Sequence, residues 1–496
     1  MSQSVKIPQS ASRFSFCTLL QQKIFRKTIS LLILLPVAMA LYAQDNTLYM
    51  MRNIHHTNIL NPAFQDNYSV FIGIPGISSL RCNLELRDFN PSDVIFSTND
   101  LGSALKDANR IDFDLFENII SLGFITGKSG LTFDFSQKMS YEFSVPGDAF
   151  VLWRNGNIDY IGKNMNFSGM KLSMNWYLEY ALGYSYKYNS KWTFGVKAKY
   201  LNGIMNITTK KWETTLYTAP DSFDITLNTD IQLQVSAPIY VTYNTTGDST
   251  EIDKIDMIKH NTGSILNNYV YYNKNRGLGF DFGAVYNLSS RLTLSASLID
   301  LGFINWRNNI YELSNSSNYE FHGIILDYDN AGDTMTDNGQ SIIDTVKALS
   351  KLHGINKNYT SSLTPKLHLG ASYHFFRWLD LGALSRTVFY ETGTTTSLTF
   401  SGNIEMWKFL TGSVSYTLIN YSPVNLGIGL GLKAGPLQLY FITDSMFGWR
   451  YDNNHDIVWP AYTRDFGFRF GLNLMFGRTT DPDKQNIPKN TRHTID

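Results

Sequence analysis

The sequence is poor in cysteine, proline and charge, and it has no long apolar run after its N-terminal region. It has 496 residues, of which 17% are charged, 2 are cysteine and 14 are proline. A soluble domain usually carries about 25% charged residues, so a string of soluble domains is not expected. The missing apolar runs of about 20 residues exclude transmembrane helices. Aromatic residues make up 14% of the chain, which excludes general disorder.

The N-terminal 43 residues have the pattern of an export signal. Basic residues precede an apolar run at positions 29–41, and small residues then lead into a polar segment. We expect a signal peptide at residues 1–43, cleaved after Ala43 or, as second choice, after Ala40; the alternative is a retained anchor. The mature chain would keep only Cys82, which excludes an intrachain disulfide. Its net charge of −5 gives no electrostatic reason to bind nucleic acid.

Period-two alternation is the strongest pattern in the rest of the chain. From Trp176 to Tyr188, aromatic or aliphatic residues occupy every second position, and glycine, alanine, serine or charged residues stand between them. The pattern resumes after a turn and recurs as far as residues 466–476. Each segment has about ten residues, the length that a tilted membrane strand needs. Soluble sandwiches also alternate, but the continuous apolar face and the aromatic residues at strand ends favour a membrane barrel.

The predicted fold is therefore all-β, an antiparallel transmembrane β-barrel of roughly 14 strands, with about 12 to 16 allowed. A single barrel domain is expected at residues 44–477, followed by a polar, disordered tail at 478–496. Apolar residues at helical spacing between Ser341 and His353 predict a short amphipathic helix in a long loop. We expect this helix at the barrel mouth or inside the lumen, where its loop could plug the barrel.

Two groups of side chains could suggest metal sites. The first is an acidic loop with Asp327, Asp329, Asp333, Asp337 and Asn338. Its irregular spacing lacks the acidic end position of a calcium loop, which favours a solvated acidic loop.

The second group is the pair His368 and His374, on one face of one strand. Six residues along a strand separate them by about 20 Å, so they cannot share a metal, and we interpret them as polar filling of the lumen. Motifs of serine hydrolases, zinc proteases and phosphate-binding loops are absent from the sequence. We interpret the Gly-x-Gly runs as strand glycines that permit close packing. The sequence predicts no catalytic residue, no cofactor and no metal.

Several short motifs resemble known barrel families. Asn58–Phe64, with its Asn-Pro-Ala, resembles the start of the PorP/SprF-type barrels of Bacteroidota. Gly73–Ser79 is similar to a neighbouring Bacteroidota family of outer-membrane barrels, known only as a domain of unknown function. Further matches follow in order at residues 161–169, 179–184, 195–203, 277–281, 300–306 and 364–366. The resemblance implies an outer-membrane barrel, without an established activity. Looser kinship with PorP/SprF implies a link to type IX secretion or gliding machinery.

The final strand also resembles the signal that barrel-assembly machinery recognises. Arg469, Gly471, Leu474 and Phe476 match its polar, glycine and apolar positions. This signal usually ends the chain, whereas a polar tail follows it here.

The leading functional hypothesis is a non-catalytic outer-membrane barrel that acts as a structural or partner-binding component, linked to type IX secretion or gliding. Its expected partners are outer-membrane lipid, the barrel-assembly machinery and type IX secretion components. The first alternative is a channel or transporter for hydrophobic or small solutes. The second is an outer-membrane hydrolase, which would need a serine or aspartate within hydrogen-bond reach of a histidine at the barrel rim.

Overall fold

The computed structural model describes residues 45–65, 67–89, 105, 108–246, 249–257, 274–321, 351–354, 357–391, 393–406, 409–419, 422–444, 449–452, 457–460 and 465–477. Of its two compact units, residues 1–41 and 42–496, only the second contains described residues. In this part of the chain, no helix has the length and apolar character needed to cross a membrane.

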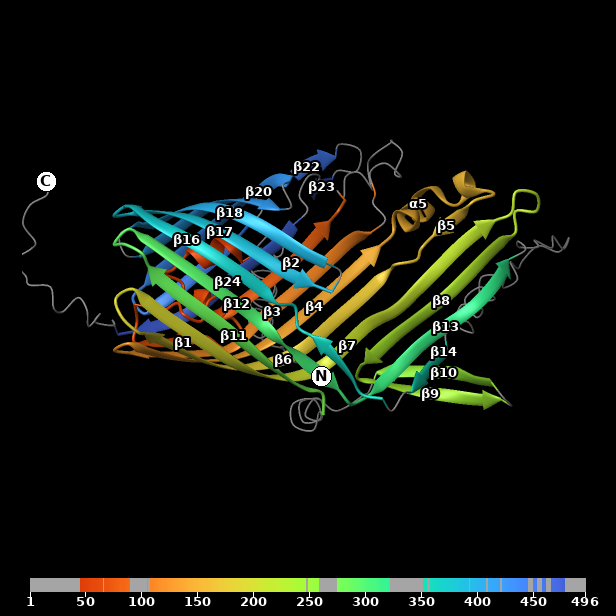
Figure 1. Ribbon diagram of the computed structural model, residues 1–496, viewed down its shortest axis with the longest axis horizontal. Coiled ribbons are helices and arrows are strands. Elements are labelled where there is room, and N and C mark those ends of the chain that lie inside the picture. The colour runs from red at the N-terminus through yellow and green to blue at the C-terminus, as the bar shows by residue number, and fades with distance from the viewer. Residues whose placement is uncertain are drawn as a thin grey trace, which may run out of the picture. The chain divides into compact units, whose positions relative to one another are not determined.

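A closed antiparallel β-barrel of 14 staves forms the second unit, which confirms the predicted fold class (Figure 1). A stave is one position in the ring, and two strands in line, β1 and β2, make the first. In ring order the strands are β1 (Val70–Gly73) with β2 (Ser79–Arg87), β3 (Asn109–Thr126), β4 (Ser129–Val145), β6 (Lys171–Lys187), β7 (Trp192–Thr218), β11 (Arg276–Asn287), β12 (Leu292–Trp306), β16 (Lys366–Phe376), β17 (Leu379–Tyr390), β18 (Gly393–Met406), β19 (Leu410–Ile419), β20 (Ser422–Ala434), β21 (Leu437–Thr443) and β24 (Asp465–Phe476).

The remaining elements lie in the lumen or in the connections between staves. They are α2 (Asn46–Met50), η1 (His55–Ile59), α5 (Gly147–Asn155), η2 (Ile158–Tyr160), β5 (Asn164–Asn166), β8 (Ile225–Ser236), β9 (Ile239–Thr246), β10 (Ser249–Met257), β13 (Ile310–Phe321), β14 (Lys351–Gly354), β15 (Tyr359–Ser362), β22 (Trp449–Asp452) and β23 (Ile457–Pro460).

The last strand closes the ring. β24 pairs with β21 on one side and with both β1 and β2 on the other; Phe476 lies opposite Val70, and Arg469 lies opposite Arg81. Closure gives the backbone groups of the first and last staves partners within the sheet. In hydrocarbon, each unpaired group would cost several kcal/mol.

Alternation along the strands separates a lipid face from a lumen face. On β6, Leu182, Tyr184 and Tyr186 are 56%, 47% and 40% exposed, whereas Ala181 and Ser185 are only 2% and 7% exposed. The apolar series predicted to face lipid therefore points outward along this part of the strand. The polar series lines the interior, as in other membrane barrels.

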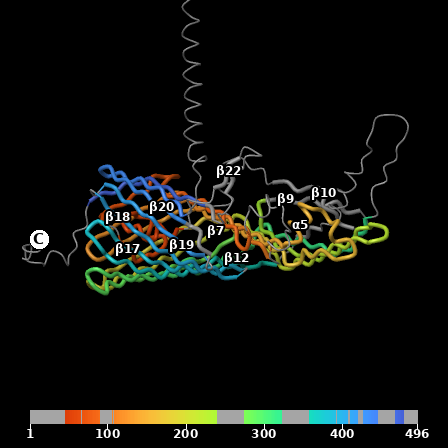
Figure 2. The backbone as a smooth tube through the Cα atoms, turned by 90° about the horizontal axis from the view of Figure 1, so that it is seen from above, coloured from red at the N-terminus to blue at the C-terminus, as the bar shows by residue number. Residues whose placement is uncertain are grey.

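The two ends of the barrel differ. Consecutive strands at one end are joined by connections as short as residues 127–128, 377–378 and 435–436, and we call this the short-turn end. At the opposite, long-loop end, β7 has 27 residues, far more than the about 9–11 that cross a bilayer. Its distal part pairs with β8, which pairs with β13, so a sheet extends past the ring at this end (Figure 2).

The helix predicted at Ser341–His353 is wrong at its C-terminal end. Residues 341–350 lie outside the described part of the chain, but Lys351–Gly354 form β14, which pairs with Tyr311–Ser314 of β13. Pairing with a neighbouring strand satisfies these backbone groups and overrides the local helical spacing. A short helix does occur in a long connection, but it is α5, between β4 and β6.

The Gly-x-Pro-Gly-x-Ser-Ser motif interrupts the first stave between β1 and β2. The interruption stays hydrogen-bonded on both sides: Ile74 N–H donates to Leu472 O at 3.2 Å, and Gly76 N–H donates to Ile119 O at 3.1 Å. Gly76 has a φ of +81°, which glycine adopts without strain. A Cβ atom at Gly73 would lie 2.0 Å from Ser78 Oγ. The glycine thus makes room for the side chain of Ser78. The hydroxyl of Ser78 contacts His56, which belongs to a chain segment inside the barrel.

Candidate functional site: a plugged lumen with a charged cavity

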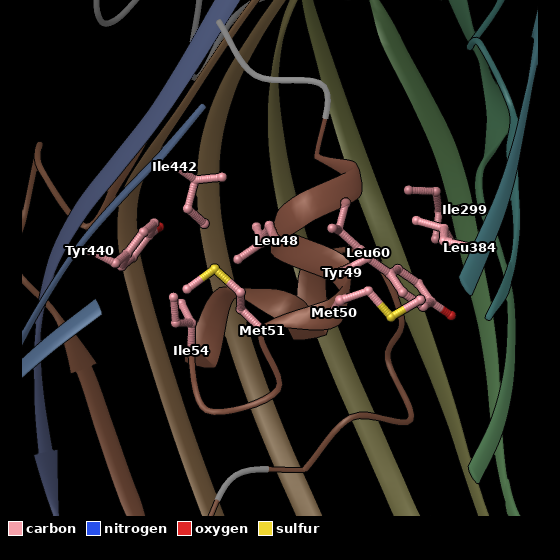
Figure 3. Close-up of a cluster of buried hydrophobic side chains, with 10 residues drawn as sticks. All are labelled: Leu48, Tyr49, Met50, Met51, Ile54, Leu60, Ile299, Leu384, Tyr440 and Ile442. Carbon is pink, nitrogen blue, oxygen red and sulfur yellow. The ribbon is translucent and has the colours of Figure 1, made fainter. Parts of the chain in front are cut away.

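Residues 45–65, which we call the plug, lie inside the barrel and contain α2 and η1. Six of the plug's apolar side chains are buried against wall residues Ile299, Leu384, Tyr440 and Ile442 (Figure 3). They are Leu48, Tyr49, Met50, Met51, Ile54 and Leu60. The lumen therefore has an apolar core of its own, built from the plug rather than from wall side chains alone.

Glycines in the wall make room for the plug. A Cβ atom at Gly195 would lie 2.2 Å from the backbone carbonyl of Pro62, and one at Gly283 would lie 2.1 Å from Asn61 Oδ1. Gly429 and Gly382 likewise face the sulfur atoms of Met51 and Met50. The sequence predicts that the strand glycines permit close packing. Some of them do so by leaving room for the plug.

Hydrogen bonds fix the plug along its length. Thr47 N–H donates to Asp444 Oδ1 at 2.9 Å, and the hydroxyl of Thr47 also contacts this carboxylate. Asn61 Nδ2 donates to Ala296 O at 3.2 Å. Near the short-turn end, Gln65 Nε2 donates to Lys128 O at 3.2 Å. Burial raises the pKa of Asp444 to about 7.

Two arginines hold Asp45 at the start of the plug. Arg81 Nη1 of β2 lies 2.5 Å from Asp45 Oδ2, and Arg469 Nη2 of β24 lies 2.7 Å from Asp45 Oδ1. Asp45 is 5% exposed. Although burial disfavours its charged form, the two guanidinium groups hold the pKa of Asp45 below its usual value. We call this arrangement the Asp45 clamp.

A second charged group, which we call the lysine cluster, surrounds Asp300. Lys138 and Lys199 lie 3.0 and 2.7 Å from Asp300 Oδ1, and Lys366 lies 2.9 Å from its Oδ2. Two further carboxylates, Glu179 and Asp281, contact these lysines.

A bulge in β12 positions Asp300. The pairing of β12 with β11 shifts register here, Asp300 has a φ of +59°, and both Ile299 and Asp300 are buried. A bulge of this kind re-aims a side chain that strict alternation would point outward.

A cavity of about 90 Å³ lies between these charged groups. Its lining includes Asp45, Arg81 and Arg469 from the clamp, Lys138, Asp300 and Lys366 from the lysine cluster, and His368 and Arg386 from β16 and β17. Tyr390 and Glu391 also line it, so the cavity reaches toward the long-loop end of β17. The space beyond the plug is therefore polar and strongly charged.

The residues proposed as an assembly signal lie on both faces of β24. Arg469 is 2% exposed and faces the plug, and a Cβ atom at Gly471 would meet Ser78 O at 2.2 Å. Leu474 pairs with Ile72, while Phe476 is 42% exposed to the outside. Recognition by the assembly machinery stays a prediction. The role of Arg469 in the clamp could not be read from the strand pattern, because it depends on contact with Asp45 far away in the sequence.

The two histidines of β16 lie in different surroundings. His368 is 1% exposed in the lumen and stacks on Tyr49 with ring centroids 5.2 Å apart. His374 lies near the short-turn end, with Nδ1 2.5 Å from Asp380 Oδ1 and a half-exposed side chain. Within the described residues, no three His, Cys, Asp or Glu side chains form a candidate metal site. The acidic loop at 327–338 lies outside that part.

Two serine–histidine contacts bear on the hydrolase alternative. His56 Nε2 lies 3.1 Å from Ser78 Oγ, and His368 Nδ1 lies 3.3 Å from Ser297 Oγ. Ser78 donates to Asn473 Oδ1, and Ser297 donates to Leu60 O, so each serine proton is already bound. Both serines are almost fully buried. The His56–Ser78 contact joins the plug to the wall, whereas Ser297 links His368 of the neighbouring strand to Leu60 O of the plug. Neither buried serine is presented to a substrate.

The plug itself is the feature that sequence reasoning did not find. The spacing at residues 341–353 predicts a helix at the barrel mouth or in the lumen, but residues 341–350 lie outside the described part of the chain. The segment that the structure places in the lumen is residues 45–65. The available signal was the early Asn-Pro-Ala segment, which is apolar yet has no alternation. The predicted signal peptide at 1–43 and the tail at 478–496 lie outside the described residues.

Sequence comparison gives a family without a stated activity. A model of a family of unknown function, DUF5723, matches residues 62–444. The chain belongs to this family. The matched region begins at Pro62 within the plug and ends at Asp444, which binds Thr47. No curated protein matches the chain.

Similar solved structures are membrane barrels. The toluene transporter TbuX of Ralstonia pickettii is 8% identical, with a TM-score of 0.39, over 89% of this chain and 98% of that one. A FadL homologue of Pseudomonas aeruginosa is 11% identical, with a TM-score of 0.39, over 88% and 99%. The translocator domain of the autotransporter NalP from Neisseria meningitidis is 7% identical, with a TM-score of 0.31, over 88% and 100%.

Proposed function

We propose that this protein is a non-catalytic outer-membrane barrel that opens a path for small solutes when its own N-terminal plug moves. The position of the plug carries the proposal: residues 45–65 fill a lumen of 14 staves. Barrels of about 8 strands fill their interior with wall side chains, whereas those of about 16 to 18 leave an aqueous channel. The ring of 14 staves is intermediate in size, and glycines in its wall make room for a separate segment. Removal of that segment would therefore leave an open path through the ring.

The attachments of the plug suit a movable element. Hydrogen bonds, ion pairs and six apolar side chains hold it, and its one covalent link to the wall among the described residues is the connection to β1. Cleavage near residue 43 stays a prediction. Short turns face the periplasm in bacterial barrels, so the charged cavity would open toward the cell exterior.

Conductance tests this proposal. Deletion of residues 46–65 keeps the predicted cleavage region and should turn a closed barrel into one with stepwise conductance in planar bilayers. Asp45→Ala, which removes the clamp, should give transient openings, while Asp230→Asn, at a largely exposed side chain of β8, should behave like the wild type. Each variant is first checked for heat-modifiable migration. A folded deletion variant that stays closed would contradict the channel.

A structural or partner-binding role is the second candidate, and the sheet of β7, β8 and β13 beyond the ring favours it. Such a sheet offers a surface outside the bilayer without contributing to a pore. The link to type IX secretion or gliding stays a prediction. Pull-down from mild detergent, with identification of the captured proteins, tests it; capture that is lost on shortening the β7–β8 hairpin would support this role.

A further inference from the structure

Arg386 on β17 is a buried cation without a partner. It is 6% exposed and lines the cavity. Among the described residues, no carboxylate oxygen lies within 4.0 Å of its guanidinium, and its buried Nε atom has no hydrogen-bond acceptor. An isolated buried charge is costly unless it is paired. The two Nη atoms of the guanidinium are then the ones that can bind a ligand in the cavity.

The other lining cations are already matched. Arg81 and Arg469 bind Asp45 in the clamp, and Lys138 and Lys366 bind Asp300 in the lysine cluster. Arg386 interacts electrostatically with Asp45, Glu85 and Asp444 over a longer range, without a direct contact. One positive charge therefore faces the cavity without a contacting counter-ion.

A second unpartnered atom lies beside it. His368 is the register neighbour of Arg386 across β16 and β17, so their Cβ atoms are about 5 Å apart. Ser297 donates its proton to Leu60 O at 2.6 Å, which leaves Ser297 Oγ to accept from His368 Nδ1. In the neutral imidazole, Nε2 is then an acceptor, and it has no partner among the described residues.

We propose that Arg386 and His368 form a binding site for a small hydroxycarboxylate. The ligand carboxylate would take the fork of the Arg386 guanidinium, and its adjacent hydroxyl would donate to His368 Nε2. A monoanion would pair with Arg386, the lining cation that no carboxylate of the described residues contacts. A cavity of about 90 Å³ has room for about six waters, enough for a ligand of lactate size. The site forms with the plug docked, because Leu60 O takes the Ser297 proton, so binding of the ligand does not require the proposed channel to open.

Calorimetric titration of the purified barrel in detergent tests the site, with sodium lactate, propionate and phosphate as probes. Lactate should bind at least tenfold more tightly than propionate, which lacks the hydroxyl, and more tightly than phosphate. Arg386→Gln should abolish lactate binding without loss of folding, because it removes an unpaired charge. Arg291→Gln, at an exposed arginine in the turn between β11 and β12, should bind like the wild type.

A second variant separates the two contacts. His368→Phe keeps an aromatic ring against Tyr49 and should bind lactate and propionate equally. Equal binding of the two acids by the wild type would overturn the proposal, as would tighter binding of phosphate. Unchanged lactate affinity in a folded Arg386→Gln variant would also overturn it. All of these outcomes are read from binding, so a closed barrel in the conductance test would leave them unaffected.

Discussion

Asp300 contacts all three lysines of the buried lysine cluster. Because the carboxylate lies 2.7–3.0 Å from Lys138, Lys199 and Lys366, its removal leaves excess positive charge buried in the lumen. Losing one partner of a buried ionic group costs about 3–5 kcal/mol.

Asp300→Ala should therefore lower the free energy of unfolding by about 3–5 kcal/mol, measured by urea titration in lipid vesicles. The matched control is Asp230→Ala, which breaks the exposed pair with Lys211; exposed pairs contribute about 0–1 kcal/mol. Equal effects of the two substitutions would show that the lysine cluster is not the buried network described here.

Two titratable groups at the plug act in opposite directions as the pH falls. Burial lowers the pKa of His56 well below its usual 6.5; nearby His55, Arg469 and Lys197 also lower it, and Asp134 opposes them. A docked plug therefore resists protonation of His56, and this contribution to docking is lost as the pH falls below about 6.5. Asp444, with its pKa raised to about 7, binds a proton in the docked state and strengthens docking over the same range.

Hydrogen exchange of the plug at pH 7.5 and pH 5, corrected for intrinsic rates, separates these contributions. In Asp444→Asn the plug should exchange faster at pH 5, because only the His56 effect remains. In His56→Asn it should exchange more slowly at pH 5, because only Asp444 titrates. The Asp45 clamp should stay charged in both cases, since the pKa of Asp45 lies below its usual value. The same pH response in both variants would contradict this assignment.

At the scale of elements, β6 and β8 differ in their position, since β6 belongs to the ring and β8 lies beyond it. Leu182 of β6 is 56% exposed on the lipid face of the ring, whereas Leu227 belongs to β8, which pairs with the distal part of β7. Leu182→Lys should destabilise the barrel by about 2–4 kcal/mol, the cost of lysine near the bilayer midplane. Leu227→Lys should cost less than about 1 kcal/mol. Folding into lipid vesicles measures both, and equal costs would place the two strands at similar depth.

The sequence predicts the strands of the barrel better than it predicts the contents of the lumen. Leu182, Tyr184 and Tyr186 could be assigned to lipid because alternation and burial on one face are local properties of a strand. The inward turn of Asp300 could not, because it depends on a bulge in the pairing with β11. The plug has no periodicity, and its helices of 5 residues each are too short to form alone. Only long-range contacts, such as Asp45 with Arg81 and Arg469, hold it in place.

For the molecule as a whole, the strand β24 is indispensable. Truncation after Arg464 removes this strand and leaves the edges of β2 and β21 without their partner. In lipid, such edges cost several kcal/mol for each unpaired group, so the shorter form should fail to assemble. Truncation after Arg478 removes only the polar tail and should assemble normally.

Heat-modifiable migration and outer-membrane fractionation, with the native leader in both forms, measure this outcome. Normal insertion of the shorter form would refute closure by β24. Failure of the longer form would show that the tail takes part in folding or in binding a partner.

The Asp45 clamp has a consequence for the order of assembly. Its two arginines come from opposite ends of the chain, Arg81 on the first stave and Arg469 on the last, and these residues are neighbours only across the closing seam. A carboxylate that needs both cannot reach its final position while the seam is open. The first segment of the barrel unit is therefore among the last to reach its final position. A docked plug implies that every strand between the two arginines has already been incorporated into the barrel.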